Sequence, residues 1–202
     1  MKRTDLLRVA SRVAKILGPQ DCLLVGGLAV GSHGYVRATK DVGFIVKGNL
    51  AEVRKRLLDE GIAAVLTKGD PLEGGFPCVK AMVGDVRVDV MPPLVPLEWE
   101  RAIEVPLTRA TVRVVDLEGL FRLKLKAGGP KDVMDVAALA LRHPEFERKA
   151  REMARAFGLA DSLGRWLADP RLKAEIQGAT SGRALERLAE KMRKPPRGGH
   201  QR

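Results

Sequence analysis

The hydrophobic and polar positions divide the chain into two parts. The first part contains patterns typical of both strands and helices, and the second part contains the helical pattern alone. Residues 4–17 place Leu, Val and Ile at helical spacing, with Arg and Lys on the other side, which predicts an amphipathic helix. Short apolar runs predict strands at 21–25, 41–46, 62–66, 78–83 and 86–91. Gly84 and Asp85 separate the last two runs and favour a β-hairpin. The first part therefore predicts a sheet with helices packed against it.

The first part also contains predicted helices at 28–33 and 50–59. In the second part helical spacing predicts helices at 117–127, 130–141 and within 145–193. The run at 105–114 predicts a pairing at the edge of the sheet. The last residues are rich in Lys, Pro, Gly and Arg and cannot pack a core, so we expect them to be disordered. We predict an α/β (α+β) fold with a mixed-sheet core at 1–115, a C-terminal helical region at 116–193 and a disordered basic tail at 194–202.

Composition and charge narrow the picture. The chain is 45% hydrophobic but only 4% aromatic, so Leu, Val and Ala must fill the core. Its net charge of +11 favours polyanionic partners, nucleic acid first, although an Arg-rich soluble surface explains the charge equally well. Cys22 and Cys78 lie in apolar runs and fit neither a zinc site nor a disulfide framework. Because there is no signal peptide and no long apolar run, we expect a cytoplasmic protein with no membrane partner.

A glycine pair marks the first candidate site. Gly26 and Gly27 remove side chains where a strand leads into a helix, and the amides there can hold a phosphate. Glycines at such a turn can also serve the turn geometry alone. Arg37 and Lys40 add positive charge nearby, either to contact phosphates or as solvated surface residues. His33 reads as a packed or capping residue, because no Ser or Cys pattern supports a triad.

Carboxylates mark the second candidate site. Asp41 opens one predicted strand and Asp89 lies in another. If the strands are neighbours, both side chains reach one face of the sheet, where paired carboxylates bind Mg²⁺. Alternatively, Asp41 caps its strand and Asp89 is an exposed hairpin residue.

A third cluster joins two predicted helices. Lys124 lies near the end of one helix and can contact phosphates. Asp132 lies in the first turn of the next helix, where the helix dipole favours a carboxylate without any function. Asp132 and Asp135 share a face by their i,i+3 spacing. The alternative reading of this cluster is helix capping with ordinary surface charge.

The order of these motifs resembles the nucleotidyltransferase superfamily with the polymerase-β-like core, and most closely its AbiEii-type branch, which includes toxins of toxin–antitoxin systems. That branch carries Gly-Gly-x-Ala, then His-Gly-x-x-Arg-x-Thr-x-Asp-hydrophobic-Asp. Here the motifs stand as Gly-Gly-Leu-Ala at 26–29 and His-Gly-Tyr-Val-Arg-Ala-Thr-Lys-Asp-Val-Gly at 33–43. The segment 123–136 looks like the same branch's Lys- and Lys-Asp-x-x-Asp-bearing helices, so the resemblance covers about residues 20–140.

The resemblance implies an activity and its residues. Mg²⁺ would position an NTP while an acceptor hydroxyl attacks the α-phosphate and pyrophosphate leaves. By the match, Asp41 and Asp89 are metal-binding catalytic carboxylates, and Lys124 meets the triphosphate. The nucleotide-binding residues that the match implies are Gly26, Gly27, Arg37, Thr39, Lys131 and Asp132. The implied partners are an NTP, an RNA acceptor such as tRNA, and an antitoxin protein.

The sequence departs from the motif at Gly43, where the branch has its second Asp. Alternate residues of a strand share a face, so residues 41 and 43 lie on the same face. The missing carboxylate is therefore one that would bridge metal ions. Its loss should weaken metal binding and slow the reaction. Gly129 also replaces an Arg often found in that branch. Three explanations stay open: the site has lost catalysis, it uses fewer metals or a carboxylate such as Asp85 or Asp132, or the glycine was introduced into this copy.

Two other functions compete with transfer. One is a non-catalytic nucleotide- or RNA-binding module, which Gly43 and Gly129 motivate. The other is an interaction subunit of a toxin–antitoxin pair that binds its partner through the helices after residue 145.

Overall fold

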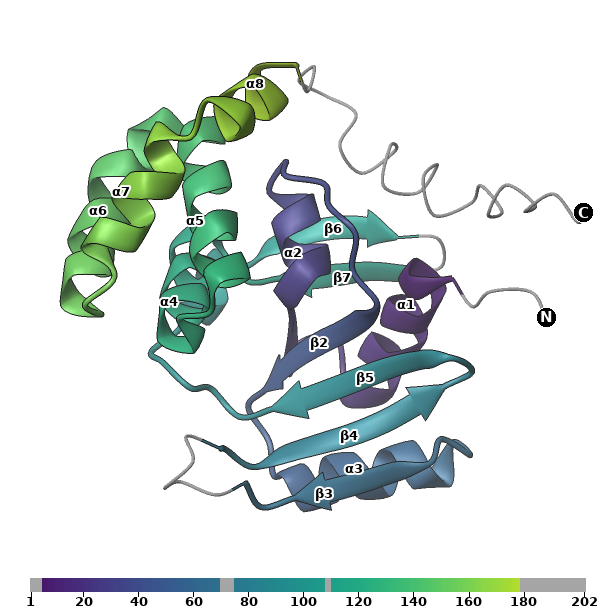
Figure 1. Cartoon of the computed structure of the whole chain (residues 1–202). Helices are drawn as coiled ribbons and strands as arrows, with labels where there is room; N and C mark the ends of the chain where they lie inside the picture. The colour runs from purple at the N-terminus through teal and green to yellow at the C-terminus, as the bar shows by residue number, and fades with distance from the viewer. Residues whose placement is uncertain (1–4, 70–74, 108–109, 179–202) are drawn as a thin grey trace, which may run out of the picture.

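A computed structural model describes residues 5–69, 75–107 and 110–178. In these ranges the chain forms one seven-stranded mixed sheet in the order β3-β4-β5-β2-β1-β7-β6 (Figure 1). The strands are β1 (Cys22–Val25), β2 (Asp41–Val46), β3 (Ala64–Thr67), β4 (Cys78–Val83), β5 (Val86–Met91), β6 (Ile103–Leu107) and β7 (Ala110–Val114). The mixed sheet confirms the predicted α/β fold.

Helices lie between the strands and after them. The α-helices are α1 (Leu6–Leu17), α2 (Gly26–Ser32), α3 (Leu50–Asp59), α4 (Leu117–Ala127), α5 (Pro130–Arg142), α6 (Glu147–Ala156), α7 (Ala160–Ala168) and α8 (Pro170–Gly178). The described residues also form the short 3-10 helices η2 (Trp99–Arg101) and η3 (Pro144–Phe146). The predicted helical region is thus confirmed as far as Gly178, and the predicted tail at 194–202 lies outside the described residues.

Strand β2 lies in the middle of the sheet and carries the key register. It runs antiparallel to β1 and parallel to β5. Gly43 lies opposite Val25 on one side and Asp89 on the other, while Asp41 lies opposite Arg87. Because alternate residues share a face, Asp41, Gly43, Arg87 and Asp89 all lie on one face of the sheet. The condition on which the Asp41–Asp89 site depends, that their strands are neighbours, is therefore met.

The two faces of the sheet are covered differently. Helices α1 and α3 pack on one face, and α2, α4 and α5 lie on the other (Figure 1). On β4 and β5 the residues facing α3, such as Val79 and Val88, are buried. Their neighbours Lys80, Met82 and Arg87 are exposed. In the described ranges the second face is therefore left open over β4 and β5, beside the carboxylates.

Local signals explain several helix ends. Asp5, Asn49 and Asp116 are N-caps whose side chains accept hydrogen bonds from backbone N–H groups in the first turns of α1, α3 and α4. Gly128 ends α4 in the left-handed conformation at φ +68°, and Pro130 begins α5. This break between α4 and α5 is the one that the Gly-Gly-Pro sequence predicts.

The predicted edge pairing at 105–114 is present, and nothing in the sequence indicated its second neighbour. Strands β6 and β7 form an antiparallel pair at one edge of the sheet, and β7 also pairs parallel with β1. Of these two strands, β6 lies at the edge of the sheet, and β7 lies inside it because it also pairs with β1, far earlier in the chain. Period-2 patterns identify strands but carry no information about such distant pairings.

The core has the composition that the sequence predicts. Phe44 and Phe121 are fully buried, and the other largest fully buried side chains are all Leu or Ile. Cys22 and Cys78 are buried free thiols, and burial raises the pKa of Cys22 to about 12. One continuous hydrophobic cluster joins the sheet to the later helices as far as Ile176. None of the helices in the described residues is long and apolar enough to cross a membrane.

Candidate functional site

The two glycines after β1 are required for different reasons. Gly26 has φ +71°, a conformation that L side chains rarely adopt, and a Cβ atom there would meet nothing within 4 Å. A Cβ atom at Gly27 would lie 2.7 Å from Thr39 Oγ1 and 2.8 Å from Thr39 Cβ. Close packing therefore requires Gly27, while Gly26 leaves its backbone open to an approaching group.

Asp41 and Asp89 converge on one guanidinium group. Arg87 Nη2 lies 2.8 Å from Asp41 Oδ2, and Arg87 Nε lies 3.1 Å from Asp89 Oδ2. Thr39 Oγ1 donates a hydrogen bond of 2.9 Å to Asp41 Oδ1 and fixes the orientation of that carboxylate. Asp89 Oδ1 is buried and has no hydrogen-bond partner among the described residues. The two carboxylates thus act as a pair, with one oxygen still unsatisfied.

Gly43 lies beside this pair and adds no ligand. A Cβ atom at Gly43 would lie 3.2 Å from Val25 Cγ2, so a larger residue needs only a small shift of that side chain. In the described ranges no group of three or more His, Cys, Asp or Glu residues is placed to hold a metal ion. The unsatisfied oxygen of Asp89 beside Asp41 fits one divalent ion. The residues do not fit a pair of ions bridged by a third carboxylate.

A buried ionic cluster joins the segment before β2 to α4 and α5. The Asp135 side chain is fully buried and accepts hydrogen bonds of 2.5 Å from both Arg37 Nε and Arg37 Nη2. Lys124 Nζ lies 2.9 Å from Asp135 Oδ2 and 2.6 Å from Asp132 Oδ1. Burial opposes the charge of Arg37, but the hydrogen bonds and charge of Asp135 raise its pKa above the ordinary value. The predicted shared face of Asp132 and Asp135 is confirmed, and both carboxylates hold Lys124.

A cavity of about 610 Å³ lies between the sheet and α4. Its apolar lining includes Ile45, Met91, Leu94, Leu120 and Leu123, its charged lining includes Lys124, Lys126 and Asp132, and Gly26 also borders it. A second hollow of about 370 Å³ is lined by Lys80, Arg87 and Asp89 and shares Gly75, Phe76 and Met91 with the first. Residues 41, 43 and 45 share one face of β2, and residues 87, 89 and 91 lie on the same face of β5. The carboxylate pair and the cavity, which Ile45 and Met91 line, are therefore adjacent along these two strands.

The structure brings most of the predicted site residues to this region. Gly26, Lys124 and Asp132 line the cavity, whereas Thr39, Asp41 and Asp89 form the carboxylate pair and its support. Gly27 packs against Thr39. Arg37 contacts Asp135. Lys131 is exposed in the first turn of α5.

Sequence reasoning missed two residues of the site. Arg87 shares a face with Asp89 by period 2, but an exposed arginine on a strand gives no signal of two carboxylate partners. Asp135 was seen only as a helical neighbour of Asp132, because its partner Arg37 is 98 residues away in the chain.

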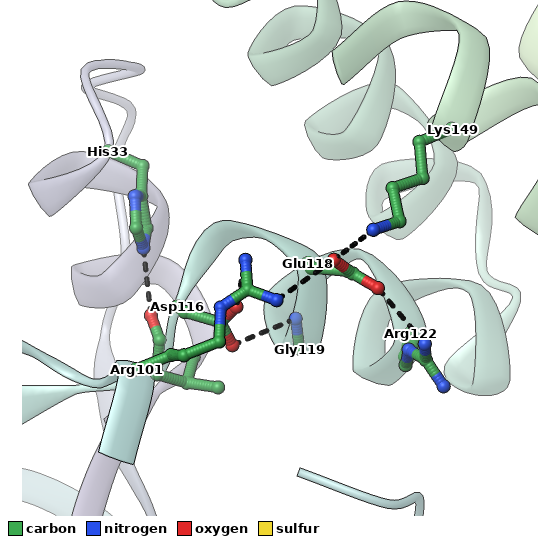
Figure 2. Close-up of polar contacts among 8 residues, drawn as sticks. His33, Arg101, Asp116, Glu118, Gly119, Arg122 and Lys149 are labelled. Carbon is green, nitrogen blue, oxygen red and sulfur yellow. Dashed lines mark hydrogen bonds and ion pairs between the residues drawn. The ribbon is translucent and has the colours of Figure 1, made fainter. Parts of the chain in front are cut away.

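A separate cluster surrounds Glu118, at the start of α4 (Figure 2). The buried Glu118 carboxylate accepts hydrogen bonds from Arg122 Nη2 at 3.0 Å, from Arg101 Nη1 at 3.3 Å and from Lys149 Nζ. The hydrogen bond from Lys149, followed by those from the two arginines, lowers the pKa of Glu118 to about 2. This cluster joins η2, α4 and α6.

His33 lies beside the same cluster and is a packing residue. Its Nε2 atom donates a hydrogen bond of 2.8 Å to the Val115 carbonyl oxygen (Figure 2). Burial lowers the pKa of His33 below its ordinary value, so the ring is neutral at physiological pH. The expectation that His33 is packed rather than catalytic agrees with these contacts.

Comparison with known proteins gives structural likeness without sequence likeness. No family model and no curated protein sequence matches this chain. The crystal structure of ANT(2'')-Ia in complex with adenylyl-2''-tobramycin matches with a TM-score of 0.56 and 12% identity, over 76% of this chain and 97% of that chain. The chain therefore has the nucleotidyltransferase fold.

Two further solved structures match with lower TM-scores. An antigenic nucleotidyltransferase-like protein from Paracoccidioides brasiliensis matches with a TM-score of 0.45 and 18% identity, over 89% of this chain and 95% of that chain. A tRNA-processing enzyme in its apo form I matches with a TM-score of 0.39 and 19% identity, over 95% of this chain and 59% of that chain.

Proposed function

We propose that this protein transfers a nucleoside monophosphate from an NTP to an acceptor hydroxyl at the Asp41–Asp89 pair. One observation carries the proposal: on this nucleotidyltransferase fold, two carboxylates from neighbouring strands meet beside a cavity that contains Gly26 and Lys124. In the reaction the acceptor hydroxyl releases its proton to solvent and its oxygen forms a bond to the α-phosphorus. The bond from that phosphorus to the oxygen that bridges the α- and β-phosphates breaks. Pyrophosphate leaves with the electron pair of that bond.

The cavity suits a nucleotide in size and lining. Its volume of about 610 Å³ lies within the range of about 300–1,000 Å³ that is usual for small-molecule sites. Leu120 and Leu123 offer apolar contact to a base. Lys124 and Lys126 offer positive charge to phosphates, and Asp132 and Asp135 hold Lys124 in place. Gly26 leaves room for phosphate oxygens to approach the backbone.

The carboxylate pair suits one Mg²⁺ ion. Asp41 and Asp89 would hold it, and the bound ion would neutralise phosphate charge and polarise the α-phosphate. Thr39 keeps Asp41 turned toward the pair through its hydrogen bond. Because Gly43 supplies no carboxylate, we expect the unaltered chain to be slower than a version with Asp at this position.

The acceptor that we propose is RNA, with tRNA as the first candidate, as in the AbiEii-type branch. The net charge of +11 supports a polyanionic acceptor, and the exposed Lys80 and Arg87 border the carboxylates on the open face of the sheet. The ANT(2'')-Ia complex contains adenylyl-2''-tobramycin, so tobramycin is the competing acceptor to test.

A transfer assay tests the proposal. The unaltered chain and Gly43→Asp are incubated with Mg²⁺ and each of the four α-labelled NTPs, together with total tRNA, with tobramycin, or without an added acceptor. We expect label on tRNA, faster with Gly43→Asp and absent with Asp89→Asn. Asp161→Asn, an exposed carboxylate on α7, is the matched control and should keep full activity. If neither the unaltered chain nor Gly43→Asp labels any acceptor, the proposal is wrong.

A second candidate function is a non-catalytic nucleotide- or RNA-binding module. The absence of a carboxylate at Gly43 and the engagement of both remaining carboxylates by Arg87 favour it. It predicts binding of NTP or RNA without turnover, with an RNA affinity that falls as salt rises. Turnover by the unaltered chain would exclude it.

A further inference from the structure

The charge at the carboxylate pair is already balanced in part by the chain itself. Arg87 contacts Asp41 at 2.8 Å and Asp89 at 3.1 Å, so one guanidinium bridges the pair on which a divalent ion would bind. Two carboxylates and one guanidinium leave a net charge of −1, compared with −2 for the pair alone. An incoming divalent ion therefore meets a weaker attraction and a positive neighbour.

The surroundings of Arg87 leave its side chain free to exchange partners. The side chain is 57% exposed, so packing does not fix it over the pair. Its neighbours across the strands are Asp41 on β2 and Met82 on β4, while Lys80 lies opposite Asp89. Lys80 adds a second positive charge beside the pair, and Gly43 adds no carboxylate that would hold a metal ion against them.

We propose that Arg87 is a tethered cation that competes with divalent metal ions for the Asp41–Asp89 pair. In the protein without ligands the guanidinium occupies the pair, and a metal ion binds only by displacing it. A consequence, which rests on the proposed function, is that the metal ion and the nucleotide enter together. The nucleotide phosphates would offer the displaced guanidinium a new partner, because arginine binds phosphate oxygens as readily as carboxylates.

Metal binding in the absence of nucleotide tests the competition independently of the transfer reaction. The full chain is titrated with Mn²⁺, and free Mn²⁺ is followed by electron paramagnetic resonance. We expect Arg87→Gln to bind Mn²⁺ at least about tenfold more tightly than the unaltered chain, because a positive charge next to the ion is removed. Arg87→Lys keeps the charge and should gain less.

Two control variants assign the effect to this pair. Arg12→Gln lowers the net charge by the same amount at an exposed position on α1, where Arg12 contacts the Glu60 carbonyl oxygen, and it should bind Mn²⁺ like the unaltered chain. Arg87→Gln combined with Asp89→Asn should lose the gain. Circular dichroism and a thermal midpoint report folding of each variant, and Arg87→Met replaces Arg87→Gln should the latter not fold.

Two results would overturn the proposal. One is an Mn²⁺ affinity of the folded Arg87→Gln or Arg87→Met variant no higher than that of Arg12→Gln. The other is a gain that survives Asp89→Asn, because the ion would then bind elsewhere. The Mn²⁺ titration contains no nucleotide, so it can be interpreted even if the transfer assay shows no activity. Likewise, the transfer assay can be interpreted even if Arg87 does not compete with Mn²⁺.

Discussion

Gly26 and Gly27 illustrate how neighbouring residues of one type serve different structural needs. Gly26 is needed for its positive φ and Gly27 for its contact with Thr39. The sequence predicts a glycine turn but gives no means of separating the two needs. The separation depends on Thr39, which lies after the α2 helix and also orients Asp41.

Gly27→Ala should therefore disturb both stability and the site. The added methyl group overlaps the Thr39 side chain, and we expect a loss of about 1–3 kcal/mol in the free energy of unfolding. Gly26→Ala meets no atom and carries only the cost of the left-handed backbone, about 1–2 kcal/mol. Urea unfolding compares the two variants, and Mn²⁺ binding should change with Gly27→Ala more than with Gly26→Ala. A Gly27→Ala protein as stable as the unaltered chain would contradict the packing argument.

Asp135 shows what a single buried charge holds together. Its carboxylate pairs with Arg37 and Lys124 and is fully buried. Asp135→Asn removes the charge and leaves both cations with a poorer partner, so we expect a loss of about 3–5 kcal/mol in the free energy of unfolding.

The matched control for this variant is Asp132→Asn. Asp132 contacts the same lysine, but its side chain is 27% exposed, and we expect a loss of no more than about 1 kcal/mol. Denaturant unfolding of both variants checks the difference. Equal losses would mean that burial of Asp135 does not determine its contribution.

At the scale of elements, the Glu118 cluster joins α4 to α6 and η2, and its strength should depend on pH. The pKa of Glu118 is about 2 in the folded protein, below its ordinary value of 4.5, chiefly because of Lys149. A carboxylate with a lowered pKa stabilises the folded state above its ordinary pKa, and this contribution is lost as pH falls toward the folded value. The relevant window is therefore between about pH 4.5 and pH 2.

Glu118→Gln should reduce this dependence. We expect a loss on the order of 2 kcal/mol near neutral pH, since three charged hydrogen-bond donors lose their anionic acceptor. We also expect a flatter slope of unfolding free energy against pH between 4.5 and 2, measured by thermal or urea unfolding. An unchanged slope would show that other carboxylates dominate acid unfolding.

Most elements could be predicted from the sequence because their signals are local. Period-2 runs located β2, β4 and β5, and the Gly-Gly-Pro break separated α4 from α5. The adjacency of the Asp41 and Asp89 strands remained conditional until the parallel pairing of β2 with β5 was seen. The pairing of β7 with β1 was missed, since it joins segments about 90 residues apart and no local pattern encodes it.

The candidate site could likewise be predicted only where its sequence signals are local. The glycine turn, both carboxylates and Lys124 follow from motifs in short segments. The partners Arg87 and Asp135 depend on strand register and on helix docking, which bring distant residues together. What sequence reasoning took as free positive charge at Arg37 is a guanidinium in contact with a buried carboxylate, while its proposed nucleotide contact stays a prediction.

At the scale of the whole molecule, the helical region and the sheet share one hydrophobic cluster, so the cavity between α4 and the sheet has a rigid frame on both sides. Lys124 reaches this cavity from the helical side, and the carboxylate pair approaches it from the sheet. In the proposed function one nucleotide would contact both parts of the chain. The RNA acceptor, the antitoxin partner and the cytoplasmic location stay predictions.

The most direct test of nucleotidyl transfer is the fate of the two ends of the triphosphate. The unaltered chain and Gly43→Asp are incubated with Mg²⁺, tRNA and the same NTP labelled either at the α- or at the γ-phosphate. The account predicts that label from the α-position appears on the acceptor, that label from the γ-position leaves as pyrophosphate, and that Asp89→Asn transfers neither. Transfer of the γ-label to the acceptor, or no transfer of either label by both proteins, would contradict it.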